Sequence, residues 1–336
     1  MKKALYLAGC LLVVITTTAC GNPKIKNGEE VVAEINGKKY TADELYKELK
    51  SQHGYETIIG WVDESIANGE VKDSKEIDSY VNEAISFYKQ YADSYGMTLP
   101  QFAANTLGIS GISSEEDLKE FIKKDRKLTL AVQNHVAAKL PEKEIKKFYD
   151  DNYKTTYNYR VIFMKDNDDT EKTVDTILKE LKNTKSDKLD SKFAELAKEY
   201  SEDSSAQDGG LYENAPKVNV EEKVWNNLSK LSDKKYSKSA ITTDNGVYII
   251  YRQGKGKTPE YKDVKEDIKS LIAQEKLNED QTLQYDALNE LRNKYKLSFK
   301  DTDLKEAYDA YLKDIENYKK QLAEQAKEEE KEKKEK

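Results

Sequence analysis

The chain has 336 residues, enough for two domains or for one elongated body with an inserted module. Charged residues make up 35% and hydrophobic residues 37%, so we expect a polar surface over several small cores. The net charge of −7 comes from closely mixed lysines and acids, and no basic stripe indicates nucleic-acid binding. Tyrosine is abundant, with 23 residues against 7 phenylalanines, which suits half-exposed grooves as well as the edges of a core.

The first twenty residues have the pattern of a secretory signal. Two lysines precede an apolar run that ends at Ile15, which is too short for a membrane span. The segment "TTAC" that follows resembles a bacterial lipobox, although Thr17 stands where leucine is favoured. The resemblance implies that residues 1–19 are removed and that Cys20 is lipidated. Simple secretion without a lipid is the alternative.

The cysteine count excludes two kinds of chemistry. Cys10 and Cys20 are the only cysteines, so a chain cleaved before Cys20 has no disulfide framework and no thiol nucleophile. Two acyl chains, at roughly 0.8 kcal/mol per buried methylene, would hold the protein on a membrane. We therefore expect residues 20–30 to form a polar tether and the protein to lie on the extracytoplasmic face of the cell membrane.

Residues 31–153 are expected to form an N-terminal helical segment. The opening "VVAEINGKKYTADELYKELK" predicts a strand, a turn at Asn36-Gly37, a second strand, and a helix capped by Thr41 with Glu44 in the capping-box position. Further helices are predicted from a Ser-capped acidic turn at "SSEEDL" and again from Pro141. Between them, apolar residues at spacings of three and four predict an amphipathic helix: Ile77, Val81, Ala84, Tyr88, Tyr91 and Tyr95.

The pattern changes in residues 154–256. The segment "TYNYRVIFM" predicts a buried strand, "VDTILKELKN", "KFAELAKEY" and "VEEKVWNNLSKL" predict helices, and "GVYIIYRQG" predicts a returning strand. This order describes a small α+β module.

Helical periodicity returns in residues 257–323. One stripe contains Val264, Ile268, Leu271 and Ile272; another contains Leu304, Tyr308, Tyr311, Ile315, Tyr318 and Leu322. The second stripe fits a coiled-coil seam or, as the simpler reading, a helix packed on the N-terminal helices. Residues 324–336 have almost no apolar side chain and predict a frayed helix or a disordered tail. The fold class is thus α+β: a mainly helical body made of N- and C-terminal segments, with the module inserted between them.

A resemblance to a known family lies in the module. It is carried by "FAELAKEYSEDSSAQDGG", a following helix, and "ITTDNGVYIIYRQG", which resemble the parvulin family of peptidyl-prolyl cis-trans isomerases. In that family a Phe-x-x-Leu-Ala helix leads into a Ser/Asp-rich loop and Gly-Gly, and a Gly-x-His-Ile-Ile strand closes the domain. With the lipobox and flanking helices, the set resembles PrsA-type extracellular foldase lipoproteins and, more distantly, SurA-type periplasmic chaperones.

The resemblance implies an incomplete set of site residues. Asp203 stands where parvulins carry the Cys or Asp that faces the substrate imide; the alternative is a turn cap, because Asp near Gly often binds local amides. The two family histidines are replaced by Val161 and Tyr248. The proline pocket corresponds to Val220 and Val224, so it stays apolar and becomes shallower. The chain's own histidines, His53 in an expected loop and His135 on an expected helix surface, lie outside the module.

An isomerase of this kind needs no cofactor, metal or nucleophile. The barrier of about 18–20 kcal/mol arises because twisting the imide breaks its resonance, and placed hydrogen bonds stabilise the twisted amide. Tyr248 has a hydroxyl that can donate one such bond, whereas Val161 has no side-chain donor. The resemblance therefore implies weak isomerase activity or none.

We expect a membrane-anchored foldase or chaperone that assists secreted proteins. Its partners would be unfolded or partly folded secreted polypeptides and, through Cys20, the membrane; a homodimer stays open. Two alternatives also stay open at this point. One is a fully active prolyl isomerase, and the other is a non-enzymatic envelope lipoprotein that binds one fixed partner.

Overall fold

The structure is a computed structural model that describes residues 25–335, so the expected signal segment 1–19 and Cys20 lie outside it. The chain divides into two compact units. One contains the residues up to His135 and from Leu277 onward, and we call it the helical body. The other, Val136–Lys276, we call the inserted domain. Within the described range, no helix is both long enough and apolar enough to cross a membrane.

The helical body begins with a hairpin of β1 (Val31–Ile35) and β2 (Lys38–Thr41). Asn36 and Gly37 form its turn with φ of 51° and 75°, as the Asn-Gly signal predicts. Helix α1 (Ala42–Leu49) follows with the predicted capping box: the Glu44 amide donates to the Thr41 hydroxyl, and the Thr41 amide donates to the Glu44 carboxylate. Both strands are exposed almost throughout, so this hairpin is held by local bonds rather than by a core.

A single π-helical turn, Lys50–Gly54, joins α1 to the next helix without a break. His53 therefore lies in helical backbone, and its expected placement in a loop is wrong, because the chain continues its helical conformation through this turn. The remaining helices of this N-terminal part are α2 (Tyr55–Glu70), α3 (Lys75–Ser94), α4 (Leu99–Asn105) and α5 (Glu115–Ala137).

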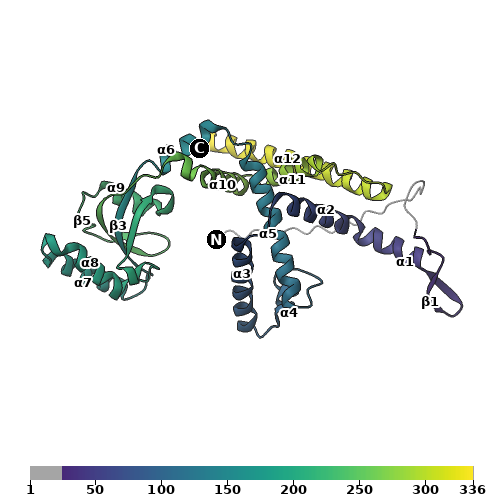
Figure 1. The fold of residues 1–336 in the computed structure, drawn as a ribbon, viewed down its shortest axis with the longest axis horizontal. Coiled ribbons are helices and arrows are strands. Elements are labelled where there is room, and N and C mark those ends of the chain that lie inside the picture. The colour runs from purple at the N-terminus through teal and green to yellow at the C-terminus, as the bar shows by residue number, and fades with distance from the viewer. Residues whose placement is uncertain (1–24, 336) are drawn as a thin grey trace. The chain divides into compact units, whose positions relative to one another are not determined.

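Helices α3, α4 and α5 enclose one small core (Figure 1), which includes Ile77, Val81, Ile85, Ala103, Leu118 and Ile122. The predicted apolar stripe of α3 is thus buried at its start but not at its end. Tyr91 and Tyr95 are 44% and 66% exposed, because this core includes no described α3 residue beyond Tyr88, and the Phe102 ring, 6.5 Å from that of Tyr91, covers Tyr91 only in part. An exposed aromatic surface remains on α3.

The C-terminal segment packs against the N-terminal helices inside the helical body. It consists of α11 (Gln281–Lys294) and α12 (Thr302–Glu335). The Arg292 guanidinium donates two bonds, of 2.8 and 2.6 Å, to the buried Asp63 carboxylate of α2. The rings of Tyr55 and Tyr311 lie 6.0 Å apart. Helix α12 therefore packs on α2, and it continues as helix through Glu335, where a frayed or disordered tail was expected.

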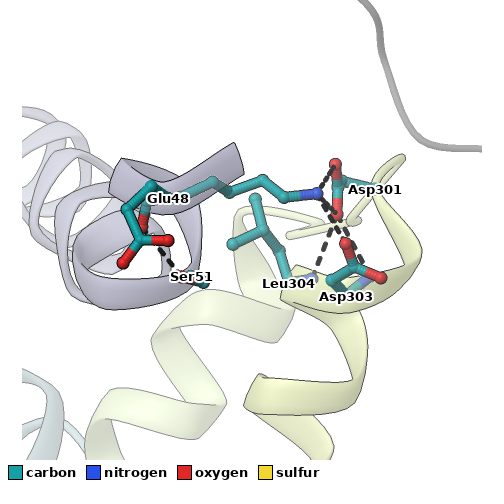
Figure 2. A network of polar contacts seen from close by, with 6 residues as sticks. Glu48, Ser51, Asp301, Asp303 and Leu304 are labelled. Carbon is teal, nitrogen blue, oxygen red and sulfur yellow. Dashed lines mark hydrogen bonds and ion pairs between the residues drawn. The ribbon is translucent and has the colours of Figure 1, made fainter. Parts of the chain in front are cut away.

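A polar network makes a second link between these distant segments. The Lys50 ammonium lies 3.1 Å from Asp301 and 2.6 Å from Asp303, at the start of α12. Asp301 also accepts the backbone amide of Leu304 at 3.2 Å and so caps the helix (Figure 2). A side chain 251 residues earlier in the chain is thus tied to the start of α12.

The inserted domain is built around an antiparallel sheet in the order β4-β3-β7-β5, with β6 also paired to β7. In the register of its two long strands, Val161 lies opposite Ile250 and Phe163 opposite Tyr248. The strands are β3 (Thr156–Met164), β4 (Leu211–Pro216), β5 (Lys235–Tyr236), β6 (Ile241–Thr242) and β7 (Val247–Lys255). The predicted buried strand and returning strand are confirmed as β3 and β7.

Helices cover both faces of this sheet (Figure 1). Helices α7 (Thr170–Asn183) and α8 (Leu189–Tyr200) bury one face, with Ile177, Phe193 and Ile249 fully enclosed. Helix α9 (Glu222–Lys230) covers the other face through Val224, Trp225 and Leu228. The functional side chains described below lie on the α9 face.

The inserted domain, Val136–Lys276, extends at both ends beyond residues 154–256, which the sequence predicts as the module. Helices α6 (Glu142–Asn152) and α10 (Tyr261–Glu279) pack together through Ile145, Ile268 and Ile272. Chain segments that precede and follow the sheet region in the sequence thus form one additional core. The predicted α10 stripe needs one correction: Leu271 is 37% exposed, since only the Ile268 and Ile272 side of the helix faces α6.

Candidate active site

The loop after α8 carries Asp203, the first predicted site residue. Asp203 Oδ1 accepts the Ser205 amide at 2.9 Å and the Tyr212 hydroxyl at 2.9 Å, and it also accepts the Ser205 hydroxyl. The bonds to Ser205 are those of the turn-cap alternative. The bond to Tyr212 is not local, because it joins the loop to β4. Asp203 therefore orders the loop and holds a tyrosine of the sheet.

Two glycines let the loop approach the sheet closely. Gly209 and Gly210 have φ of 68° and 71°, a region that L side chains rarely adopt. A Cβ on Gly210 would lie 2.1 Å from the Val161 carbonyl oxygen. The Gly210 carbonyl accepts the Val161 amide at 2.8 Å. The Gly-Gly pair is thus required by the close approach of the loop to β3.

A stacked tyrosine pair lies next to Asp203. The rings of Tyr159 and Tyr212 are 5.3 Å apart and nearly parallel. Burial raises the pKa of Tyr159 well above its usual range, and the neighbouring Tyr212 and Asp203 raise it further. Burial and the hydrogen bond to Asp203 raise the pKa of Tyr212 as well. Both hydroxyls therefore stay protonated at neutral pH and can act as hydrogen-bond donors.

Tyr248, the second predicted polar residue, lies on β7 at the same face. Its ring centre is 4.8 Å from that of Phe163. Burial raises the pKa of Tyr248 to about 12, with Glu221 as the next cause and Asp203 as a further one. Glu221 immediately precedes α9 and accepts the Asn245 side-chain amide at 3.3 Å. Two carboxylates thus contribute to the raised pKa of one half-buried tyrosine.

The structure also brings the three predicted pocket valines into one apolar cluster under α9. Val161 and Val224 are 3% and 2% exposed, whereas Val220 is only partly buried and packs against the cluster from outside. Of the three, Val220 keeps accessible side-chain surface, as do the half-buried rings of Tyr212 and Tyr248. The assignment of these valines to a proline pocket stays a prediction.

Several residues of this face were missed by sequence reasoning: Tyr159, Phe163, Tyr212 and Glu221. The strand β4 was also missed, because the short segment "LYENAP" has only a weak strand signal of its own. One signal was present, since alternation along "TYNYRVIFM" puts Tyr159 and Val161 on the same side of β3. No local pattern indicates that Glu221 meets a tyrosine 27 positions later, because α9 and the turn before β7 intervene.

The two histidines belong to the helical body. His135 lies in α5, and its Nε2 is 2.6 Å from the Glu290 carboxylate. This pairing agrees with a structural residue on a helix surface. In the part of the chain that the structure describes, no group of three or more His, Cys, Asp or Glu side chains is arranged to hold a metal ion.

Comparison with known proteins gives consistent results. Residues 140–266 match the family model of the PPIC-type PPIase domain. The foldase protein PrsA of Geobacillus kaustophilus is 30% identical over 285 residues, which cover 83% of this chain and 88% of the relative. The foldase protein PrsA of Bacillus subtilis is 28% identical over 311 residues, covering 92% and 94%. In fold, the chain is similar to foldase protein PrsA from Streptococcus pneumoniae, with a TM-score of 0.57, 21% identity, and coverage of 83% and 98%.

Proposed function

The chain belongs to the PrsA foldase family, and from this premise we propose that it is a membrane-anchored extracytoplasmic foldase that assists the folding of secreted proteins. The observation that carries the proposal is the extent of the likeness, which spans 83% of this chain and 88% of a foldase relative. The likeness thus includes the helical body as well as the isomerase domain. The partners of the protein are unfolded or partly folded secreted polypeptides.

We assign client binding to the exposed aromatic surface of α3, which consists of Phe87, Tyr91 and Tyr95. The rings of Phe87 and Tyr91 lie 4.7 Å apart, so they offer continuous apolar area. Aromatic side chains combine large contact area with adaptable polar tips, which suits a surface that receives many different chains. Large apolar side chains left exposed together are typical of interaction sites.

The isomerase domain, for which we keep the limits 154–256, is proposed to have weak activity or none. An isomerase must donate hydrogen bonds that favour the twisted imide. The Tyr212 hydroxyl is already donated to Asp203, and Val161 has no side-chain donor. Tyr248 is half-buried, and its hydroxyl is the donor that we assign to the substrate, with the Glu221 carboxylate as the competing acceptor. One donor in place of a family pair supports the expectation of low turnover.

The proposal includes lipid anchoring at Cys20 and a tether over residues 20–30. It rests on the signal-like first twenty residues and on the lipobox resemblance. Metabolic labelling of the full chain with a radioactive fatty acid, with Cys20→Ser as the control, tests this part. Label on the wild-type chain and none on the variant is the expected result; equal labelling of both rejects the anchor.

The foldase function itself is tested by aggregation suppression. The chain from residue 21 onward is mixed with a chemically unfolded secreted enzyme, and light scattering is followed after dilution. We expect scattering to fall as the chain is added in stoichiometric amounts. Scattering that is the same with this chain and with an equal mass of serum albumin would reject the proposal and favour a lipoprotein with one fixed partner.

A further inference from the structure

Two carboxylates at the candidate active site have no cationic partner. Asp203 is bound by the Ser205 and Tyr212 groups, which are neutral, and its second oxygen, Oδ2, accepts no hydrogen bond from any described residue. The groups beside Glu221 are the neutral Asn245 amide, which it accepts, and the neutral Tyr248 hydroxyl. No lysine or arginine of the described chain forms an ion pair with either carboxylate.

Other partly buried acids of the inserted domain are paired. Arg160 binds Asp190 at 3.0 Å, Lys192 binds Glu180 at 2.7 Å, and Lys276 binds Glu144 at 3.0 Å. Lys223 on α9, two positions after Glu221, donates to the Thr242 carbonyl at 3.5 Å. The candidate active site therefore carries uncompensated negative charge, whereas the other partly buried acids of the inserted domain are neutralised by ion pairs.

This negative charge lies beside aromatic rings that a ligand can touch. Tyr248, Tyr212 and Phe163 are all half-buried and lie on or next to the α9 face of the sheet. Asp203 accepts the Tyr212 hydroxyl, and Glu221 follows Val220 and accepts the side-chain amide of Asn245, three positions before Tyr248. Tyr212, Val220 and Tyr248 pack on the same apolar cluster, so both carboxylates lie beside it. A cationic side chain at this place gains attraction to the carboxylates and to the ring face. An anionic side chain meets repulsion from both acids.

We propose that the site prefers proline peptides in which a lysine or arginine is next to the proline, with Glu221 and Asp203 as the residues that determine this specificity. The inference rests on the proposed function, since it assumes that proline peptides bind at this face. It goes further in stating the substrate class. Glu221 has the larger role, because Asp203 is already shared among several donors.

The test measures proline cis-trans exchange by NMR with the chain from residue 21 onward, which contains every residue the structure describes. Three peptides differ only in the residues on either side of one proline, which are both Lys, both Ala or both Glu. We expect the Lys-flanked peptide to be exchanged roughly tenfold faster than the Glu-flanked peptide at low salt. The ratio should fall as ionic strength rises.

The key variant is Glu221→Gln, and Glu222→Gln is the matched control with the same change of charge at an exposed neighbouring position. We expect E221Q to bring the Lys/Glu ratio within about twofold, and E222Q to keep it near the wild-type value. Equal exchange of all three peptides, above the uncatalysed rate, overturns the inference and leaves the foldase proposal intact.

Peptide binding is measured in the same samples from chemical-shift changes. If no peptide is exchanged, tighter binding of the Lys-flanked peptide that E221Q removes still supports the inference, and it shows an inactive isomerase domain. If no peptide binds, or if all bind equally, the inference fails. The foldase proposal depends on aggregation suppression, which this experiment does not measure, so the two failures are distinguishable.

Discussion

The helical body and the inserted domain differ in how far their large apolar side chains are buried. Among the described residues, all but one of the large hydrophobic side chains that are strongly exposed belong to the helical body, the exception being Leu271. The inserted domain covers both faces of its sheet with helices and encloses three apolar clusters, one on each face of the sheet and one between α6 and α10. The helical body has a core around Leu118 and buries further residues such as Ile66 and Leu291, yet it leaves the hairpin, α1 and part of α3 uncovered.

The difference has a physical origin in the two architectures. A sheet with helices on both faces buries each strand residue from one side or the other. A body of long helices buries only the stripe that faces a neighbour, and the rest of each helix stays at the surface. The helical body thus keeps apolar area available for binding, whereas in the inserted domain the large hydrophobic side chains are buried or half-buried, apart from Leu271. The following predictions test this contrast.

The largest effect is expected for a phenylalanine in each unit. Phe193 is fully buried under the sheet, so Phe193→Ala should destabilise the inserted domain by about 3–5 kcal/mol. Phe87 is 54% exposed on α3, so Phe87→Ala should lower the free energy of unfolding by under about 1 kcal/mol. Trp225 fluorescence in a Trp61→Phe background reports unfolding of the inserted domain. Equal losses of unfolding free energy, measured for the inserted domain in F193A and for the helical body in F87A, would contradict the contrast.

The buried ion pair of the helical body comes next. Arg292→Ala leaves the Asp63 carboxylate buried without its partner, which should destabilise the helical body by about 3 kcal/mol. Lys294→Ala, two positions later, removes an exposed pair with Glu70 and should change stability by less than about 0.5 kcal/mol. Denaturant unfolding followed by circular dichroism measures both. A loss in R292A no larger than in K294A would mean that this link does not hold the two segments together.

The smallest effect concerns pH. The pKa of Tyr248 is about 12 in the folded chain, above its ordinary value of about 10, so its contribution to stability is complete below pH 10 and is lost as pH rises toward 12. Tyr248→Phe should therefore lose less stability between pH 9 and 11 than the wild type. The difference should be under about 1 kcal/mol, because the side chain is half-exposed. Tyr95→Phe in the helical body serves as the control, and a wild-type slope in Y248F would refute the assignment.

The local parts of the fold could be predicted from the sequence. The Asn36-Gly37 turn and the Thr41 capping box each depend on neighbouring residues, and the structure contains both. The strands β3 and β7 were predicted from their apolar and β-branched runs. The fold class was also predicted, because helices on both sides of a strand-helix-strand module indicate an insertion.

The contacts between distant residues could not be predicted in this way. Strand β4 is short and forms its bonds with β3, so its own sequence is a weak signal. Periodicity predicted the apolar stripe of α3 but not how far the neighbouring helices cover it. The exposure of Tyr91 and Tyr95 was therefore not predicted. At the site, Asp203 was found through its family position, whereas Glu221 and Tyr212 became visible only when the sheet and α9 were assembled.

The central claim is that the helical body, and not the isomerase site, holds unfolded clients. The most direct measurement is light scattering of an unfolded secreted enzyme in the presence of two variants. One replaces Phe87, Tyr91 and Tyr95 of α3 with serine, and the other is Tyr248→Phe. We predict that the α3 variant loses most of its aggregation suppression while Y248F keeps the wild-type level. Suppression retained by the α3 variant and lost in Y248F would contradict the claim.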